Sequence, residues 1–358
     1  MATSTKQAIA GRKTYQLSKA ENYNQEVGKI KVLLLSEQEA AELLSIEEVM
    51  EAVENAFREK ALGYAQMPPK VYLNFPKYNG DVRAMPAYLE RLDVASVKIV
   101  NSHPENPRKF GLPTVSATVV LLDPRNGALL ALMGGNRITA MRTAAAGGIA
   151  AKYLANRNSK TASFIGAGVQ ARAQLQALLV VFPNLEEIRV CDISPKAAEA
   201  FASEAKSKAA QCRVVVVGNE AEAVHEADIV VTTTPSKKPM VFDAWVSDGT
   251  HFNCIGADAP LKEELDPAIL KRAKVVVDDW EQASHSGEIN VPLSKGVLFK
   301  NDVWAELGDI VAGTKAARTS KDEITVFDST GLAIQDAATV ELVYRKAVSR
   351  KVGCIINI

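Results

Sequence analysis

The apolar positions of this chain recur at two spacings, one typical of helices and one typical of strands. In residues 49–57 the apolar side chains return after three or four positions, and Glu and Lys occupy the other side. This spacing predicts a helix that packs one face against a core. Just before it, serine is twice followed three residues later by glutamate, at Ser36 with Glu39 and at Ser45 with Glu48. These capping-box pairs predict that two helices begin there in succession.

Short runs rich in β-branched residues occupy the chain from Val71 to Leu132, and clusters of Pro, Gly and Asn separate them. Such runs predict the strands of an antiparallel or mixed sheet. The predicted strands read VYLNF, VASVKIV, TVSATVVLL and ALLALM, and an earlier run, KIKVLLL, is a further candidate. The segment FPKYNGDVR, which begins at the end of the first run, is expected to form a long turn.

Strand and helix patterns alternate in the second half of the chain. An alanine-rich helix over residues 140–155 leads to a strand that begins at Thr161, and further strands and helices follow to the end. This alternation predicts a parallel sheet with right-handed crossovers. The predicted fold class is therefore α/β, with a Rossmann dinucleotide-binding domain and a second α+β domain. The later predicted strands read EEIRVCD, RVVVV, DIVVTTT, HFNCIGAD, AKVVVDD and ITVFD.

A glycine-rich turn lies between the strand at Thr161 and the next helical pattern. Gly166, Gly168 and Ala171 stand there at G-x-G-x-x-A spacing. The first glycine permits a tight turn, the second lets the backbone approach a pyrophosphate, and the alanine lets helix and strand pack closely. Amides at the helix start would face the phosphates. An ordinary strand-to-helix turn is the alternative, since such glycine motifs are common.

Asp192 ends the strand that follows this helix. At this distance from the glycine turn an acid accepts hydrogen bonds from the ribose hydroxyls and disfavours a 2′-phosphate. Asp192 therefore predicts NAD rather than NADP as the cofactor. The alternative is that Asp192 merely opens the turn DISP.

The carboxyl ends of the later strands select further candidates, because ligands of open parallel sheets bind beyond these ends. They are residues 232–235 after one strand and residues 256–258 after another. Asp258 follows small residues and precedes Pro260, which places its carboxylate over the nicotinamide end as a candidate acid or base. A role as a helix cap or turn former stays open for it.

Four cations stand in otherwise apolar surroundings: Lys70, Arg83, Lys98 and Arg142. Each could be a surface side chain that lays its stem on apolar neighbours. Lys98 is the most informative, because it occupies the middle of an apolar strand. It either faces water by alternation or lines a site.

Composition and charge narrow the classes of partner. Lys plus Arg and Asp plus Glu each number 42, so no net field attracts nucleic acid, and no nucleic acid partner is expected. The apolar runs are shorter than the roughly 20 residues that cross a bilayer, and the N-terminus lacks a signal-peptide core. We therefore expect a cytoplasmic protein with no membrane partner.

Three further features limit the chemistry. The four cysteines are widely separated, which is typical of buried strand cysteines rather than of a disulfide framework. The four histidines lack the spacing of metal ligands, so no metal is expected. Residues 1–28 are polar without sustained periodicity and are expected to form a flexible extension.

Several separated stretches together resemble the ornithine cyclodeaminase, μ-crystallin and archaeal alanine dehydrogenase family, from about residue 30 to the end of the chain. The matching stretches include QMPPKVYL, RAMPAYL, KIVNSHPENP, MRTAAAGGIAAKYLA, IGAGVQA, VTTTPSKKP, IGADAP, VVDDWEQASHSGEINVPLSKG and VFDSTGLAIQD. The resemblance implies a substrate-binding and dimerisation domain over residues 29–145, completed by residues 330–358. It implies a Rossmann domain over residues 146–329 and a homodimer.

The resemblance also implies roles for individual residues. Lys70, Arg83 and Arg142 would bind the substrate carboxylate, and Asp258 with Lys98 nearby would manage protons and the hydrolytic water. The expected contacts of NAD are Thr143, Gly166, Gly168, Val169, Gln170, Asp192, Thr233, Thr234, Ile255 and Ser329.

The reaction common to the family is hydride exchange between a nicotinamide and the α-carbon of an amino acid or imine. Ornithine cyclodeaminases have an acid where this chain has Arg83, and a cation there would repel a diamino acid. The resemblance therefore favours an L-alanine dehydrogenase that forms pyruvate and ammonia. One departure from the family pattern is Leu261, which stands at a usual glycine.

Two alternatives remain open. The same chemistry could serve a reductase of cyclic imines, such as pyrroline-2-carboxylate, or a cyclodeaminase of ornithine or lysine. A protein of another class, which retains a small ligand and NAD(P)H as μ-crystallin does, is the second alternative.

Overall fold

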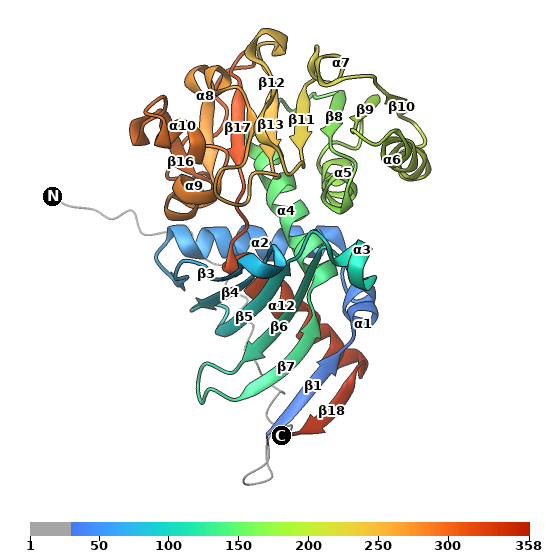
Figure 1. Ribbon diagram of the computed structural model, residues 1–358. Coiled ribbons are helices and arrows are strands. Elements are labelled where there is room, and N and C mark those ends of the chain that lie inside the picture. The colour runs from blue at the N-terminus through green and yellow to red at the C-terminus, as the bar shows by residue number, and fades with distance from the viewer. Residues whose placement is uncertain (1–29) are drawn as a thin grey trace, which may run out of the picture.

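A computed structural model describes residues 30–358 as two stacked parts, each built on its own sheet (Figure 1). One eight-stranded sheet lies in the lower half of the view, and a second eight-stranded sheet lies in the upper half. The α/β fold class predicted from the alternating pattern is confirmed. The extension predicted over residues 1–28 lies outside the described residues.

The lower sheet is mixed, as its patterns predicted. Its strand order is β18-β1-β7-β6-β5-β4-β2, and β3 pairs with β4. Strands β1 and β7 are parallel, and the other neighbours are antiparallel. The strands are β1 (Lys31–Leu35), β2 (Ala65–Gln66), β3 (Val71–Phe75), β4 (Gly80–Leu89), β5 (Val94–Ser102), β6 (Val115–Leu122), β7 (Leu129–Gly134) and β18 (Cys354–Asn357).

Helices cover one face of this sheet. Helix α12 packs against β4, β5 and β6, and α2 packs against both α12 and α4. The two predicted capping serines, Ser36 and Ser45, accept hydrogen bonds from the amides of Glu39 and Glu48 at the starts of α1 and α2. The helices of this half are α1 (Glu37–Glu42), α2 (Ile46–Ala61), α3 (Asn106–Phe110), α4 (Asn136–Leu154) and α12 (Ala333–Arg350).

The upper sheet is wholly parallel, with strand order β10-β9-β8-β11-β13-β17-β15-β16. Its strands are β8 (Thr161–Ile165), β9 (Glu187–Cys191), β10 (Arg213–Val216), β11 (Ile229–Thr232), β13 (His251–Cys254), β15 (Lys274–Val277), β16 (Val303–Glu306) and β17 (Thr325–Asp328). The glycine turn follows β8, where the strand order reverses direction. This is the position at which open parallel sheets bind ligands.

Helices and one small sheet surround the upper strands. Strands β12 (Lys237–Val241) and β14 (Glu263–Leu265) form a separate parallel pair. The helices are α5 (Val169–Val181), α6 (Pro195–Lys208), α7 (Glu220–Val224), α8 (Pro267–Arg272), α9 (Trp280–Ser286), α10 (Asn290–Ser294) and α11 (Leu307–Val311).

Two long connections join the halves. Helix α4 runs from the lower half up to the strand β8, and β17 leads back down into α12 (Figure 1). The carboxyl ends of the upper strands therefore face the lower sheet. Residues at these ends can meet residues of β4, β5 and α12.

The long turn predicted over FPKYNGDVR is wrong. A short 3-10 turn at Pro76–Tyr78 joins β3 to β4, which already begins at Gly80. Strand β4 was not predicted from the sequence, because it contains Pro86 and proline is disfavoured in a central strand. On one edge of β4, Pro86 lies opposite Val97 of β5. On the other edge, one segment of β4 pairs with β3 and another pairs with β2, and Pro86 lies between these two segments. Pro86 is therefore tolerated, because neither β2 nor β3 pairs with it.

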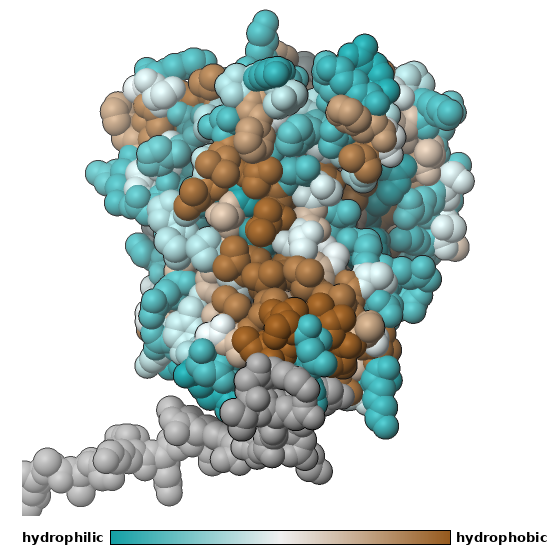
Figure 2. All heavy atoms as spheres, turned by 60° about the horizontal axis from the view of Figure 1, so that its bottom comes forward, coloured by the Kyte–Doolittle hydropathy of each residue, from teal (hydrophilic) through white to brown (hydrophobic). Residues whose placement is uncertain are grey.

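The lower sheet exposes apolar side chains on the face away from α12. Leu132 lies opposite Val120, and Val120 lies opposite Val97, so these three residues form one row across β7, β6 and β5. Leu132 is 36% exposed, and Ile99 on the same face is 47% exposed. Figure 2 shows an apolar patch on the lower part of the molecule.

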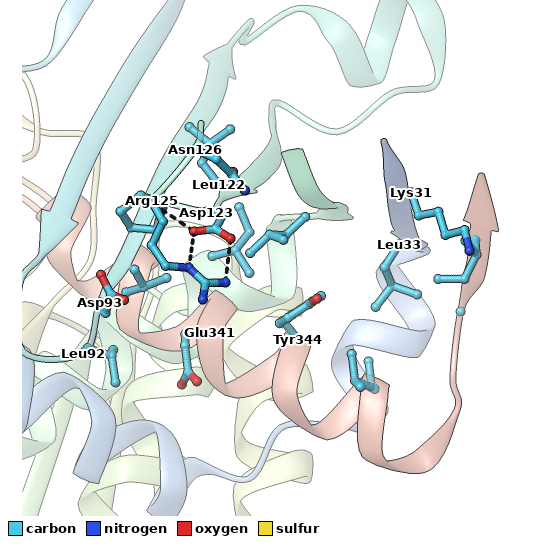
Figure 3. A pocket seen from close by; sticks show the side chains of 18 of the residues that line it. Lys31, Leu33, Leu92, Asp93, Leu122, Asp123, Arg125, Asn126, Glu341 and Tyr344 are labelled. Atoms are coloured by element: carbon cyan, nitrogen blue, oxygen red, sulfur yellow. Dashed lines mark hydrogen bonds and ion pairs between the residues drawn. The ribbon is translucent and has the colours of Figure 1, made fainter. Parts of the chain in front are cut away.

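A cavity of about 830 Å³ lies where α12 meets the lower ends of β1, β5 and β6. Figure 3 shows the Arg125 guanidinium bonded to Asp123 on one side, with Glu341 and Tyr344 of α12 nearby. The described residues that line it include none of the predicted site residues. This cavity is therefore not the predicted active site, whose residues lie between the two halves.

No helix within residues 30–358 combines the length and the apolar character needed to cross a membrane.

Candidate active site between the two sheets

Two of the four predicted cations are buried and share one carboxylate. The Lys98 Nζ lies 2.8 Å from Asp336 Oδ2, and the Arg142 Nε lies 2.9 Å from Asp336 Oδ1. The Lys98 side chain is 1% exposed and that of Arg142 is 7% exposed, so neither is a surface cation. Arg142 also donates to Gln335 Oε1 at 2.9 Å.

One carboxylate cannot neutralise two cations. When Lys98 is protonated, Asp336 leaves a surplus positive charge at Lys98 and Arg142, and a buried charge is costly unless an opposite charge pairs with it. Burial lowers the pKa of Lys98 to about 7, and the neighbouring Arg142 adds to the effect. A small anion bound beside these cations would neutralise the surplus charge and would stabilise the charged form of Lys98.

Lys70 lies at the same place, from the short segment before β3. Its Nζ donates to the carbonyl oxygen of Thr330 at 2.7 Å. Burial lowers the pKa of Lys70 to about 8, against the opposing charges of Asp278 and Asp258. Lys70, Lys98 and Arg142 thus form a group, which we call the cation cluster.

Asp258 follows β13, from the other half of the molecule. Its Oδ1 lies 2.5 Å from Lys262 Nζ, and its Oδ2 lies 3.7 Å from Arg83 Nη1. The partial loss of hydration in the cleft alone would raise the pKa of Asp258, but Lys262, Arg83 and Lys70 outweigh this effect and lower that pKa. The side chain is 41% exposed, so an ionised carboxylate remains open to a ligand.

Arg83 differs from Lys98 and Arg142, which share one carboxylate, because it has its own carboxylate partner, Asp81. It donates to both carboxylate oxygens of Asp81, at 2.9 and 3.2 Å, and lies over the Tyr72 ring. The pair brings Arg83 beside Asp258 rather than into the cation cluster. Asp81 offsets part of the charge that Arg83 presents to a substrate.

The glycine turn has the geometry that a dinucleotide needs. Gly166 adopts φ +93°, and a Cβ there would lie 2.8 Å from Thr233 Oγ1, so a larger residue would be strained and crowded. A Cβ on Gly168 would meet nothing within 4 Å. Val169, the first residue of α5, is 70% exposed. The backbone at the start of α5 therefore borders open space, as pyrophosphate binding requires.

Asp192 lies against this turn. Its Oδ2 accepts from the Ala167 amide at 2.7 Å, and its Oδ1 accepts from the Ser194 amide at 2.7 Å. The Asp192 carboxylate therefore makes both contacts that the sequence suggested, one with the glycine turn and one with the turn DISP.

The other predicted cofactor residues lie around the carboxyl ends of the strands. Thr143 Oγ1 donates to Thr139, Thr233 Oγ1 donates to Gly166, and Ile255 is buried. The buried oxygens Gln170 Oε1 and Ser329 Oγ have no hydrogen-bond partner among the described residues. Such orphaned polar atoms fit a site that a polar cofactor completes.

Sequence reasoning missed the acids that organise the site. Asp336 carries the buried ion pairs, and Asp278 accepts from Thr330 and Gly331 amides at 2.7 and 2.8 Å. Burial raises the pKa of Asp278 to about 6. A signal was present, since Asp336 ends the stretch VFDSTGLAIQD and lies on the apolar side of the closing helix. Lys98 contacts this acid rather than Asp258, the neighbour that the sequence suggested.

The family model of ornithine cyclodeaminase and mu-crystallin matches residues 30–351 of the chain. This chain belongs to that family. Among its relatives, alanine dehydrogenase of Archaeoglobus fulgidus is 53% identical over 324 residues, which cover 90% of this chain and 98% of that protein.

Solved structures of the ornithine cyclodeaminase/mu-crystallin family agree with the fold. An archaeal alanine dehydrogenase dimer with bound NAD matches with a TM-score of 0.87 and 52% identity, over 91% of this chain and 99% of that one. Δ1-pyrroline-2-carboxylate reductase of Thermococcus litoralis, in complex with NADH and L-proline, gives 0.87 and 44% over 90% and 99%. The family resemblance inferred from separated motifs is confirmed.

Proposed function

We propose that this family member is an NAD-dependent dehydrogenase that interconverts L-alanine and pyruvate with ammonium. The observation that carries the proposal is the surplus positive charge at Lys98 and Arg142, which a small carboxylate substrate would neutralise. The similarity to alanine dehydrogenases that bind NAD supports both the reaction and the cofactor.

NAD would be held by the residues around the glycine turn. The open space at Gly168, the exposed start of α5 and the orphaned oxygens of Gln170 and Ser329 fit this group. Asp192 would accept from the ribose hydroxyls and disfavour a 2′-phosphate. When bound, the nicotinamide supplies the acceptor for the hydride from the alanine Cα and the donor for the reverse reaction.

The cation cluster would orient the substrate. Lys70 and Arg142 bind its carboxylate, with Lys98 beneath them, so that Cα points toward the carboxyl ends of the upper strands. Arg83 lies where a diamino acid would need an acid for its distal ammonium, and the Asp81–Arg83 pair offers it a cation instead. The geometry therefore favours a substrate with a short, uncharged side chain.

Asp258 would move the protons. Its lowered pKa keeps it ionised at neutral pH, so it would accept a proton from the substrate ammonium before the hydride leaves and release that proton to solvent. It would then accept a proton from the water that attacks the imine and return it to the nitrogen, which leaves as ammonia and takes up the hydroxyl proton to become ammonium. Over the whole reaction alanine, NAD⁺ and water give pyruvate, ammonium, NADH and one proton. Lys262 holds the Asp258 carboxylate in place throughout.

We also propose that two copies associate through the exposed face of the lower sheet. The apolar row of Val97, Val120 and Leu132 and the patch in Figure 2 support this, since exposed apolar surface of this kind marks interaction sites. The similar archaeal alanine dehydrogenase is a dimer.

A substrate panel tests the proposal. Oxidation of NADH and NADPH is measured with pyruvate plus ammonium, with other 2-oxo acids plus ammonium, and with pyrroline-2-carboxylate. We expect the highest kcat/KM for pyruvate, ammonium and NADH. A preference for pyrroline-2-carboxylate would assign an imine reductase instead, and tight NADH binding without turnover on any substrate would favour a binding protein.

A further inference from the structure

Glu264 is a buried carboxylate that the proposed mechanism does not use. It lies in β14, directly after the loop that carries Asp258, and is 0% exposed. Four hydrogen bonds end on it. Its Oε1 accepts from the Thr234 amide and hydroxyl, both at 2.7 Å, and its Oε2 accepts from the Thr232 hydroxyl at 2.8 Å and the Gly256 amide at 3.0 Å.

These donors come from the ends of two neighbouring strands. Thr232 ends β11, Thr234 follows this strand, and Gly256 follows β13. The two ends approach so closely that a Cβ on Gly256 would lie 2.2 Å from the Thr234 carbonyl oxygen. Glu264 therefore joins two loops, one bearing the predicted cofactor residues Thr233 and Thr234 and the other bearing Asp258.

Gly256 links Glu264 to Asp258 and Lys262 through hydrogen bonds. Its amide donates to Glu264, while its carbonyl oxygen accepts from the Asp258 amide at 3.0 Å and from Lys262 Nζ at 3.2 Å. A displacement of Gly256 would therefore move both Asp258 and the cation that fixes its carboxylate.

The carboxylate form suits these donors. Each oxygen faces a backbone amide, which can only donate, so an acceptor is required at both positions. A second buried acid, Glu288, lies behind, and its carboxylate accepts from the amides of Glu264 and Leu265. Burial raises the pKa of Glu288 well above its usual value, and the charge of Glu264 adds to this. Burial also raises the pKa of Glu264, though less far, so of the two acids Glu288 is the one that holds a proton more readily.

We propose that Glu264 is a positioning residue, which ties the ends of β11 and β13 together and thereby places Thr234 and Asp258 for hydride and proton transfer. The inference rests on the proposed function. Glu264 lies in the upper half of the molecule, whereas the cation cluster comes from the segment before β3, from β5 and from α4. Its loss should therefore impair turnover and NADH binding but not the binding of pyruvate.

The test compares Glu264→Gln with Glu263→Gln in the full-length protein. The first change puts an amide NH₂ group opposite a backbone N–H, so one hydrogen bond is lost and two donors face each other. Glu263 is the matched control. It lies on the same strand, is 2% exposed, and its carboxylate lies 3.7 Å from Lys295.

For E264Q we expect kcat to fall about 100-fold, as misplacement of catalytic groups does, with a weaker NADH affinity and an unchanged KM for pyruvate. E263Q should keep wild-type values of all three. Wild-type kcat and NADH affinity in folded E264Q would overturn the inference, and so would equal losses in both variants.

A second variant covers the case in which E264Q does not fold. Thr232→Val removes one of the four donors without changing the shape of the side chain, and it should lower kcat with KM for pyruvate unchanged. Wild-type kcat in this variant would then overturn the inference. An inactive wild-type protein would contradict the proposed function instead, and NADH affinity, measured by fluorescence titration, would still test Glu264.

Discussion

At the scale of single residues, the site depends on charges that do not cancel. Lys98 and Arg142 share the single carboxylate of Asp336, which leaves a surplus of positive charge between the two sheets. This positive charge would attract the carboxylate of a substrate. The sequence suggested each cation separately. It could not show that their common partner lies in the closing helix, because these contacts join residues 238 and 194 positions apart.

Replacing Asp258 by Asn tests the proton-transfer step. The amide keeps the size of the side chain but cannot accept a proton, so turnover should fall about 100- to 10,000-fold. NADH should bind as in wild type, because the glycine turn is untouched. Steady-state kinetics and NADH fluorescence check the two expectations, and near-wild-type turnover would remove Asp258 from the mechanism.

The binding of pyruvate should depend on pH through two lysines. The pKa values of Lys98 and Lys70 are about 7 and about 8, and a lysine carries its charge only below its pKa. Affinity for the anion should therefore be greatest below pH 7 and should fall as pH rises through 7 to 8.

The measurement is the dissociation constant of pyruvate for the enzyme with NADH bound, across pH 6 to 9 in a buffer of constant ionic strength. Lys98→Met is the comparison variant, and it should bind pyruvate more weakly with a shallower pH dependence. A constant affinity across this range in the wild type would contradict the role of the cation cluster.

At the scale of elements, an ion triad ties the halves together. Lys60, near the end of α2, lies 2.9 Å from Asp279 Oδ2 and also contacts Glu306, at the starts of α9 and α11. Burial lowers the pKa of Lys60, but the two carboxylates outweigh it and raise that pKa. This triad fixes α2 to the upper half beside Asp278.

Lys60→Met should lower the free energy of unfolding by about 1–3 kcal/mol, because it leaves two partly buried carboxylates without their cation. Lys271→Met is the control, since the exposed Lys271–Asp302 pair should contribute less than about 0.5 kcal/mol. Urea unfolding of both variants gives the comparison. Equal effects would show that the triad is no stronger than a surface pair.

Elements with a strong local signal could be predicted, and elements that depend on distant partners could not. The capping pairs at Ser36 and Ser45 and the strand of the glycine turn were visible in the sequence. Strand β18 was not, because its four residues become a strand by pairing with β1 at the other end of the described chain. The domain limits near residues 145 and 330 stay a prediction, which the two separate sheets support.

At the scale of the whole molecule, the exposed face of the lower sheet points to an assembly. The row through Val97, Val120 and Leu132 continues to Leu34 of β1, so apolar side chains cross most of the sheet. The helices cover the opposite face. A second copy would remove this surface from water.

Leu132→Asp should therefore shift the protein from dimer to monomer, since a charge in an apolar interface is costly to bury. Val216→Asp is the control, because Val216 is 43% exposed on the far edge strand of the upper sheet. Light scattering after size exclusion gives the mass of each variant. A dimer that persists in Leu132→Asp would place the interface elsewhere, and a monomeric wild type would contradict the proposed dimer.

Isotope transfer tests most directly whether the site moves a hydride between NADH and the α-carbon of alanine. NADH deuterated at the transferred position of C4 is incubated with the protein, pyruvate and ammonium, and the product is analysed by mass spectrometry and NMR. We expect L-alanine with one deuterium at Cα, and its formation should be about 100- to 10,000-fold slower with Asp258→Asn. Alanine without the label, or no alanine while pyrroline-2-carboxylate yields labelled proline, would contradict the proposed reaction.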